Sequence, residues 1–100
     1  MALLDDVKQA LRISSSNTAF DTEIQTLIDA ARLDLKQAGV FDVLVDATEP
    51  DALIKRAIIT YAKANFGYDN PEADRFNGAY VMLKQHLSLY GDYRNDGGES

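Results

Sequence analysis

The chain of 100 residues has 46% apolar and 26% charged residues, a formal net charge of −6 and no cysteine. This length allows one domain with a modest core, and the composition is that of an ordinary soluble globular domain. No apolar run approaches the roughly 20 residues that a membrane-spanning helix needs. Without cysteine, disulfides and thiolate metal sites are excluded. The negative charge argues against a protein that holds nucleic acid by its phosphates, but not against one that lets DNA slide past.

Two amphipathic helices are predicted in the first part of the chain. Apolar residues recur at helical spacing over residues 2–13 and, after a polar break, over residues 18–38. Thr18 with Asp21 resembles a capping box at the start of the second helix. Gly39 suits its end, because glycine readily adopts the left-handed conformation that stops helices.

The third predicted helix, residues 50–66, is the one around which we expect the rest to pack. Its apolar residues fill a continuous arc of about half the circumference, which is wider than a surface helix needs. The opposite arc carries Lys55, Arg56 and Lys63, with Ile59 among them. Because an apolar side chain among three cations is poorly placed in water, either another part of the chain or another molecule should cover it. These four residues are therefore candidate interface residues.

The fourth predicted helix, residues 71–90, is joined to the third by a short turn. Asn70 is a good N-cap, Pro71 suits the first helical position and Gly91 suits the stop. Its inner face should carry Phe76, Tyr80, Leu83, Leu87 and Tyr90. The fold class is therefore predicted as all-α, a small bundle of four main helices.

The segment 39–49 is predicted to be an irregular acidic loop. Its apolar residues could form a short strand or anchor a loop, and periodicity does not decide between the two over so few residues. The carboxylates of this region, which contains no basic residue between them, are Asp42, Asp46, Glu49 and Asp51. They form either a solvated connection or an acidic projection that faces a partner.

Little in the sequence indicates catalysis. His86 is the only histidine, and its place on a helix flank favours a surface or interface role. The chain has no cysteine nucleophile, P-loop, dinucleotide-binding glycine pattern, zinc-protease motif or EF-hand spacing. We therefore expect no enzyme, and no catalytic, cofactor-binding or metal-binding residue.

Several stretches, taken in order, resemble the head-tail connector (adaptor) proteins of tailed bacteriophages, which are often labelled DNA-packaging proteins. They are residues 4–13, 24–32, 57–61, 66–73 and 83–93. The resemblance covers nearly the whole chain except the last few residues, and the order of the stretches carries more weight than any one of them. Between Gly39 and Pro50 no family pattern is recognised.

The resemblance implies an all-α subunit that assembles as a ring, expected to be dodecameric, beneath the portal protein of the capsid. The ring would extend the DNA channel and present a surface to the next head-completion or tail protein. DNA would pass without sequence-specific binding, and no membrane or cofactor would be involved. The protein would lie at the head-tail interface of the virion after assembly in the host cytoplasm.

Two other classes of function are compatible with the residues alone. One is a small cytoplasmic helical regulator that works by pairing, such as an antitoxin-like module. The other is a small enzyme or ligand-binding bundle, which a pocket with clustered polar groups would favour.

Residues 1–93 are expected to form a single helical connector domain, and residues 94–100 a flexible tail that could order on a partner. Tyr93, at the start of this tail, joins the candidate interface residues.

In a ring, the four carboxylates of the acidic region would form a negative belt if they faced the channel. Such a belt would keep the phosphates of passing DNA from adhering, within a screening length of about 8–10 Å. The alternative is that this region faces a neighbouring subunit.

Overall fold

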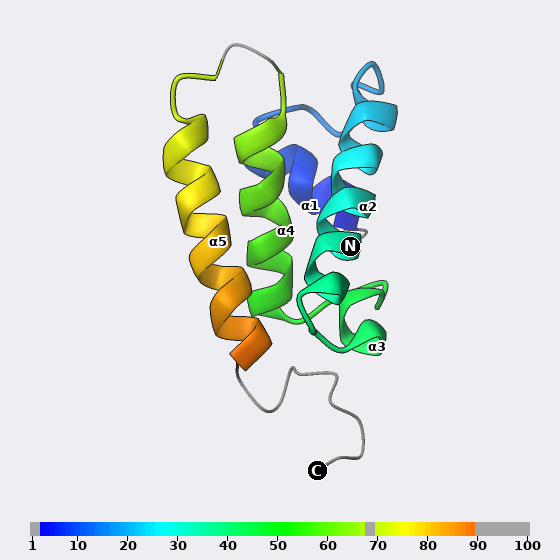
Figure 1. The fold of residues 1–100 in the computed structure, drawn as a ribbon. Coiled ribbons are helices and arrows are strands. Elements are labelled where there is room, and N and C mark those ends of the chain that lie inside the picture. The colour runs from blue at the N-terminus through cyan, green and yellow to red at the C-terminus, as the bar shows by residue number, and fades with distance from the viewer. Residues whose placement is uncertain (1–2, 68–69, 90–100) are drawn as a thin grey trace.

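A computed structural model describes residues 3–67 and 70–89 of the chain, and it confirms the predicted all-α bundle (Figure 1). Four long helices form the bundle, and a fifth helix of a single turn lies in the segment that was predicted to be irregular. The helices are α1 (Leu3–Ala10), α2 (Asp21–Gln37), α3 (Asp42–Val45), α4 (Ala52–Asn65) and α5 (Ala73–Leu89).

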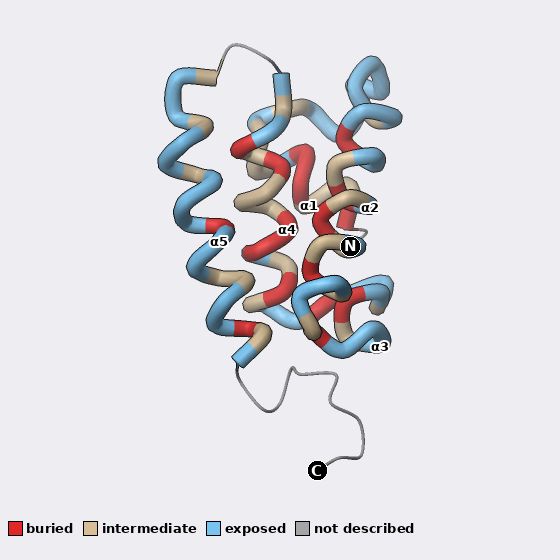
Figure 2. Tube along the Cα trace, in the orientation of Figure 1, coloured by how far each residue is buried: buried red, intermediate tan, exposed pale blue. Residues whose placement is uncertain are grey.

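Helix α4 is the centre of the bundle, as its wide apolar arc predicted. It packs against α1, α2 and α5, whereas α3 packs against α2 (Figure 1). Its core face is formed by Ile54, Ala57, Ile58 and Ala62, all fully buried. Figure 2 shows the buried positions of α1, α2 and α4 turned towards one another. Fully burying each isoleucine contributes about 1.5–3 kcal/mol, so this face supplies much of the stability.

Segment 39–49 is more ordered than the prediction of an irregular loop. Val40, just before α3, and Val45, its last residue, are fully buried and anchor the segment in the core. The guanidinium of Arg32 donates hydrogen bonds to the carbonyl oxygens of Val45 (3.1 Å) and Ala47 (2.9 Å), which lie at and beyond the end of α3. A helix of one turn is too short to show helical periodicity in the sequence. Here the long-range hydrogen bonds from Arg32 hold it in place.

A polar contact with α2 fixes which face α5 turns towards the bundle. The Tyr80 hydroxyl donates to Oδ2 of Asp34 (2.6 Å), and the Lys84 ammonium lies 2.9 Å from the same oxygen. Burial acts to raise the pKa of Asp34, but the hydrogen bonds from Tyr80 and Lys84 outweigh it and leave this pKa below its ordinary value. Burial, together with the bond to Asp34, raises the pKa of Tyr80.

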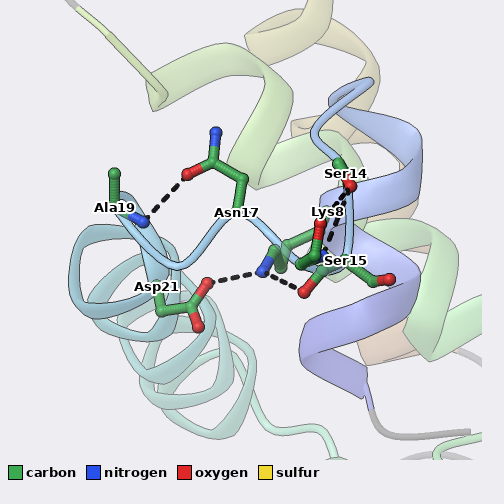
Figure 3. Close-up of polar contacts among 7 residues, drawn as sticks. Lys8, Ser14, Ser15, Asn17, Ala19 and Asp21 are labelled. Carbon is green, nitrogen blue, oxygen red and sulfur yellow. Dashed lines mark hydrogen bonds and ion pairs between the residues drawn. The ribbon is translucent and has the colours of Figure 1, made fainter.

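The predicted capping box at the start of α2 is wrong. Helix α2 begins at Asp21, and its N-cap residue Phe20 makes no side-chain capping bond. The Asp21 carboxylate instead lies 2.7 Å from the ammonium of Lys8, which also donates to the carbonyl of Ser15 (3.2 Å; Figure 3). Lys8 is only 2% exposed. This ion pair fastens the start of α2 to α1.

Removing Asp21 from this ion pair should cost more stability than removing Lys8. Asp21→Ala should lower the free energy of unfolding by about 2–3 kcal/mol, because it leaves a buried ammonium without a counter-ion. Lys8→Met should cost about 1 kcal/mol, because methionine keeps the buried stem and the remaining carboxylate, 31% exposed, is reached by water. Urea unfolding followed by circular dichroism measures both, and equal losses would contradict this account.

Helices α1 and α2 end in the same way although their sequences differ. Arg12 (φ 66°) and Gly39 (φ 103°) both occupy the left-handed region just past the helix. In each case the N–H of the following residue bonds to the carbonyl five residues earlier, at 2.9 and 3.0 Å respectively. Because of this conformation of Arg12, α1 ends before residue 13, where the sequence pattern predicted its end.

Substitutions at these two left-handed positions should change the stability of the protein in opposite directions. Arg12→Gly should stabilise the protein by about 0.5–1 kcal/mol, because glycine adopts the left-handed conformation without the steric cost of a side chain. Gly39→Ala should destabilise it by about 1 kcal/mol through the backbone alone, since an added Cβ would meet no atom within 4 Å. Thermal unfolding of both variants tests the pair, and a loss of stability in Arg12→Gly would contradict the assignment.

Candidate functional site

A groove with a volume of about 580 Å³ runs between α4 and α5. We call it the α4–α5 groove. Its lining consists of Arg56, Ile59, Thr60 and Lys63 from α4 and of Arg75, Phe76, Ala79, Met82, Leu83 and His86 from α5. The volume lies within the range of about 300–1,000 Å³ that is usual for binding sites.

The groove combines an apolar floor with basic edges. Its lining includes no carboxylate, although the chain as a whole has a net charge of −6. The Lys63 ammonium and the Arg75 guanidinium lie 5.4 and 4.6 Å from the ring centroid of Phe76. Glu72 forms an ion pair with Arg75 and therefore neutralises only one of the cations. An apolar segment that carries negative charge is the ligand that this lining would accept.

The groove exists because α4 uses two opposite faces. At about 100° per residue, the side chains of Arg56, Ile59 and Lys63 lie on the other side of the helix from the buried Ile54 and Ile58. Ile59 itself is half-buried and packs against the core, with α5 covering it in part. The apolar residue among cations is thus partly covered by the chain itself, and the rest of its surface faces the groove.

Asn70 positions the start of α5 against the end of α4. Its side-chain amide donates to the carbonyl of Lys63 (2.6 Å), and its side-chain oxygen accepts from the N–H of Glu72 (3.0 Å). Because α5 begins only at Ala73, Asn70 is not the N-cap residue that was predicted, and its bond to Glu72 instead closes the turn that leads into the helix. Because Lys63 lines the groove, this contact fixes the geometry of that end of the site.

The structure brings together three of the five residues predicted for the interface. Arg56, Ile59 and Lys63 line the groove, and their role in binding stays a prediction. The Lys55 ammonium lies 2.9 Å from Asp6 instead, on the side of α1. This hydrogen bond raises the pKa of Lys55, against the opposing effect of desolvation. Tyr93, like the predicted tail 94–100, lies outside the described residues.

The four carboxylates predicted to face a channel do not form a uniform patch. Asp51 caps α4, its side chain accepting the N–H of Ile54 at 3.1 Å. Asp46 lies 2.9 Å from the Lys36 ammonium, and Glu49 lies 3.8 Å from that of Lys55. Asp42 is exposed in the first turn of α3. Whether these residues face a channel stays a prediction.

Sequence reasoning missed the half of the groove that α5 contributes. Phe76 and Leu83 belong to the predicted inner face of this helix, and both line the groove, as does Met82, which lies outside that face. Met82 is 70% exposed. The sequence does contain a signal for it: Ala79, Met82 and Leu89 form a second apolar line beside the inner face and leave apolar surface on the flank of α5.

Neither a cluster of metal ligands nor a membrane-spanning helix is found in the described residues. They contain no group of three or more histidine, aspartate or glutamate side chains that could hold a metal ion. None of the helices in the described part of the chain has the length and apolarity to cross a membrane.

Comparison with known proteins gives one positive result. A family model described as phage connector protein matches residues 3–94, which is nearly the whole chain. No curated protein and no solved structure gives a significant match.

The exposure of the groove residues predicts how the isolated subunit tolerates charge. Met82→Asp should change the free energy of unfolding by less than about 0.5 kcal/mol, because its side chain is already in water. Ile59→Asp should cost about 1–3 kcal/mol, because part of this side chain packs against the core. Urea unfolding of the monomer distinguishes the two, and a larger loss in Met82→Asp would mean that the groove is closed in solution.

Proposed function

Because the chain belongs to the phage connector protein family, we propose that it is a head-tail connector that forms a ring under the portal protein. Membership of this family implies a structural component of the virion. In the proposed role, the ring extends the DNA channel and docks the next head-completion or tail protein. The family match over residues 3–94 is the observation that carries the proposal. It favours this role over that of a helical regulator.

Apolar surface left exposed on the subunit supports assembly. Met82 borders the apolar floor of the α4–α5 groove, and Val43 in α3 and Phe41 just before it are exposed. Isolated apolar side chains on a surface are common, but a contiguous groove of them with a basic edge is typical of an interaction site. A subunit that carries two such surfaces is suited to contact more than one neighbour.

The charge of the chain supports the passage of DNA. Each subunit carries a formal net charge of −6, so a ring multiplies negative charge around its axis. Phosphates repel such a wall only within a screening length of about 8–10 Å at physiological salt. The proposed ring would therefore guide the duplex without holding it.

Assembly can be tested on the full chain, alone and with the portal protein of the same phage. We expect native mass spectrometry to detect a single closed oligomer on the portal, and a dodecamer if the ring follows the symmetry that the family resemblance implies. Negative-stain images should show a ring with an open centre. The portal protein alone and an unrelated portal serve as controls. A chain that stays monomeric in every mixture would contradict the proposal.

A further inference from the structure

A second surface complements the α4–α5 groove. We define the α3 segment as residues 41–49, which include α3 and the turns on either side. Val43 is 67% exposed and Phe41 is 40% exposed, an unusual arrangement for two large apolar side chains so close in sequence. Asp42, Asp46 and Glu49 flank them and are exposed, and the segment contains no basic residue.

The two surfaces are opposite in charge and alike in apolarity. Lys36 and Lys55 neutralise part of the α3 segment through Asp46 and Glu49, but no ion pair among the described residues engages Asp42. The groove offers three cations, of which one is paired with Glu72. An excess of negative charge around apolar side chains on one surface thus matches an excess of positive charge around an apolar floor on the other.

The positions of the two surfaces exclude a contact within one subunit. Helix α3 lies against α2 at one edge of the bundle, and α5 forms the opposite edge (Figure 1). A pairing of two grooves would bring Arg56 and Lys63 against the same cations of the partner, which charge repulsion disfavours. A contact between two different surfaces is heterologous, and repetition of such a contact closes into a ring when the rotation permits.

We infer that the α3 segment of one copy docks into the α4–α5 groove of the next copy, and that this contact joins neighbouring subunits of the ring. The occupant of the groove is therefore a second copy of this chain. Val43 and Phe41 enter the apolar floor beside Ile59 and Met82, and the aspartates of the segment meet the basic edge. The inference rests on the proposed function, because it names the subunit contact of that ring.

This arrangement selects between the two interpretations of the acidic region. A channel-facing belt needs carboxylates whose charge is free to act on DNA, but Asp46 and Glu49 already have lysine partners and Asp51 caps α4. A subunit contact needs only a local excess of charge beside apolar side chains, which the α3 segment provides. The neighbouring subunit is therefore the partner that these contacts favour.

A charge exchange tests the contact in the full-length chain. The groove variant is Arg56→Glu with Lys63→Glu, and the segment variant is Asp42→Lys with Asp46→Lys. Each alone should need at least about tenfold more protein to form rings than the wild type, because like charges then meet at every contact. An equimolar mixture should recover assembly as alternating rings, since each altered surface then meets an opposite charge. A chain with all four substitutions should assemble alone for the same reason.

Two single variants serve as matched controls. Arg12→Glu and Asp29→Lys reverse exposed charges of each sign outside both surfaces, and they should assemble as the wild type does. Thermal unfolding of every variant in the monomeric state checks that the subunit remains folded. Assembly is followed by native mass spectrometry, with the portal protein present where the wild type requires it.

The results separate this inference from the proposed function. Wild-type rings with groove and segment variants that assemble equally well would overturn the inference alone. So would folded variants that fail separately and are not recovered in the mixture, because the two surfaces would then not face each other. If the groove variant assembles normally but loses binding of a short DNA duplex that the wild type retains, the groove serves DNA instead. A wild type that forms no ring with its portal overturns both.

Discussion

Helix α4 contributes one face to the core and the opposite face to the α4–α5 groove, and the rest of the structure depends on this constraint. One face buries Ile54, Ala57 and Ile58 against α1 and α2, and the opposite face turns Arg56 and Lys63 outward. A helix with 3.6 residues per turn presents both faces along its whole length, so core and groove are formed by opposite faces of the same turns of one rigid element. Changes in the core would therefore be transmitted to the groove as shifts of the same helix.

The long helices could be predicted because apolar spacing over ten or more residues is a strong signal. What the spacing did not contain were contacts between distant residues. Lys8 stands at the flank of the apolar face of α1, where a lysine usually reaches water, and only the folded chain brings it to Asp21. The single turn of α3 is too short to produce a periodic apolar pattern, and its position depends on Arg32, at least ten residues away.

Half of the candidate site could likewise be predicted from the sequence. The helical wheel of α4 identified Arg56, Ile59 and Lys63, because an apolar residue among cations is unusual whatever packs nearby. The half from α5 depends on how that helix is rotated about its axis. Its rotation is set by the bond from Tyr80 to Asp34, across 46 positions of sequence. No local pattern carries that information, so the sequence did not show which residues of α5 would meet Ile59 and Lys63 across the groove.

The distribution of charge reconciles two requirements that the net charge alone would place in conflict. In the proposed role, negative charge lets DNA pass without adhering, yet identical negative subunits repel one another when they assemble. Screening limits each of these effects to about 8–10 Å at physiological salt, so only the charges at a contact decide whether that contact forms. In the proposed ring, cations gathered in the α4–α5 groove and carboxylates gathered in the α3 segment would allow attraction between neighbours despite the net charge of −6. The same separation makes a head-to-tail contact more favourable than a symmetric one, and a head-to-tail contact is the kind that a ring requires.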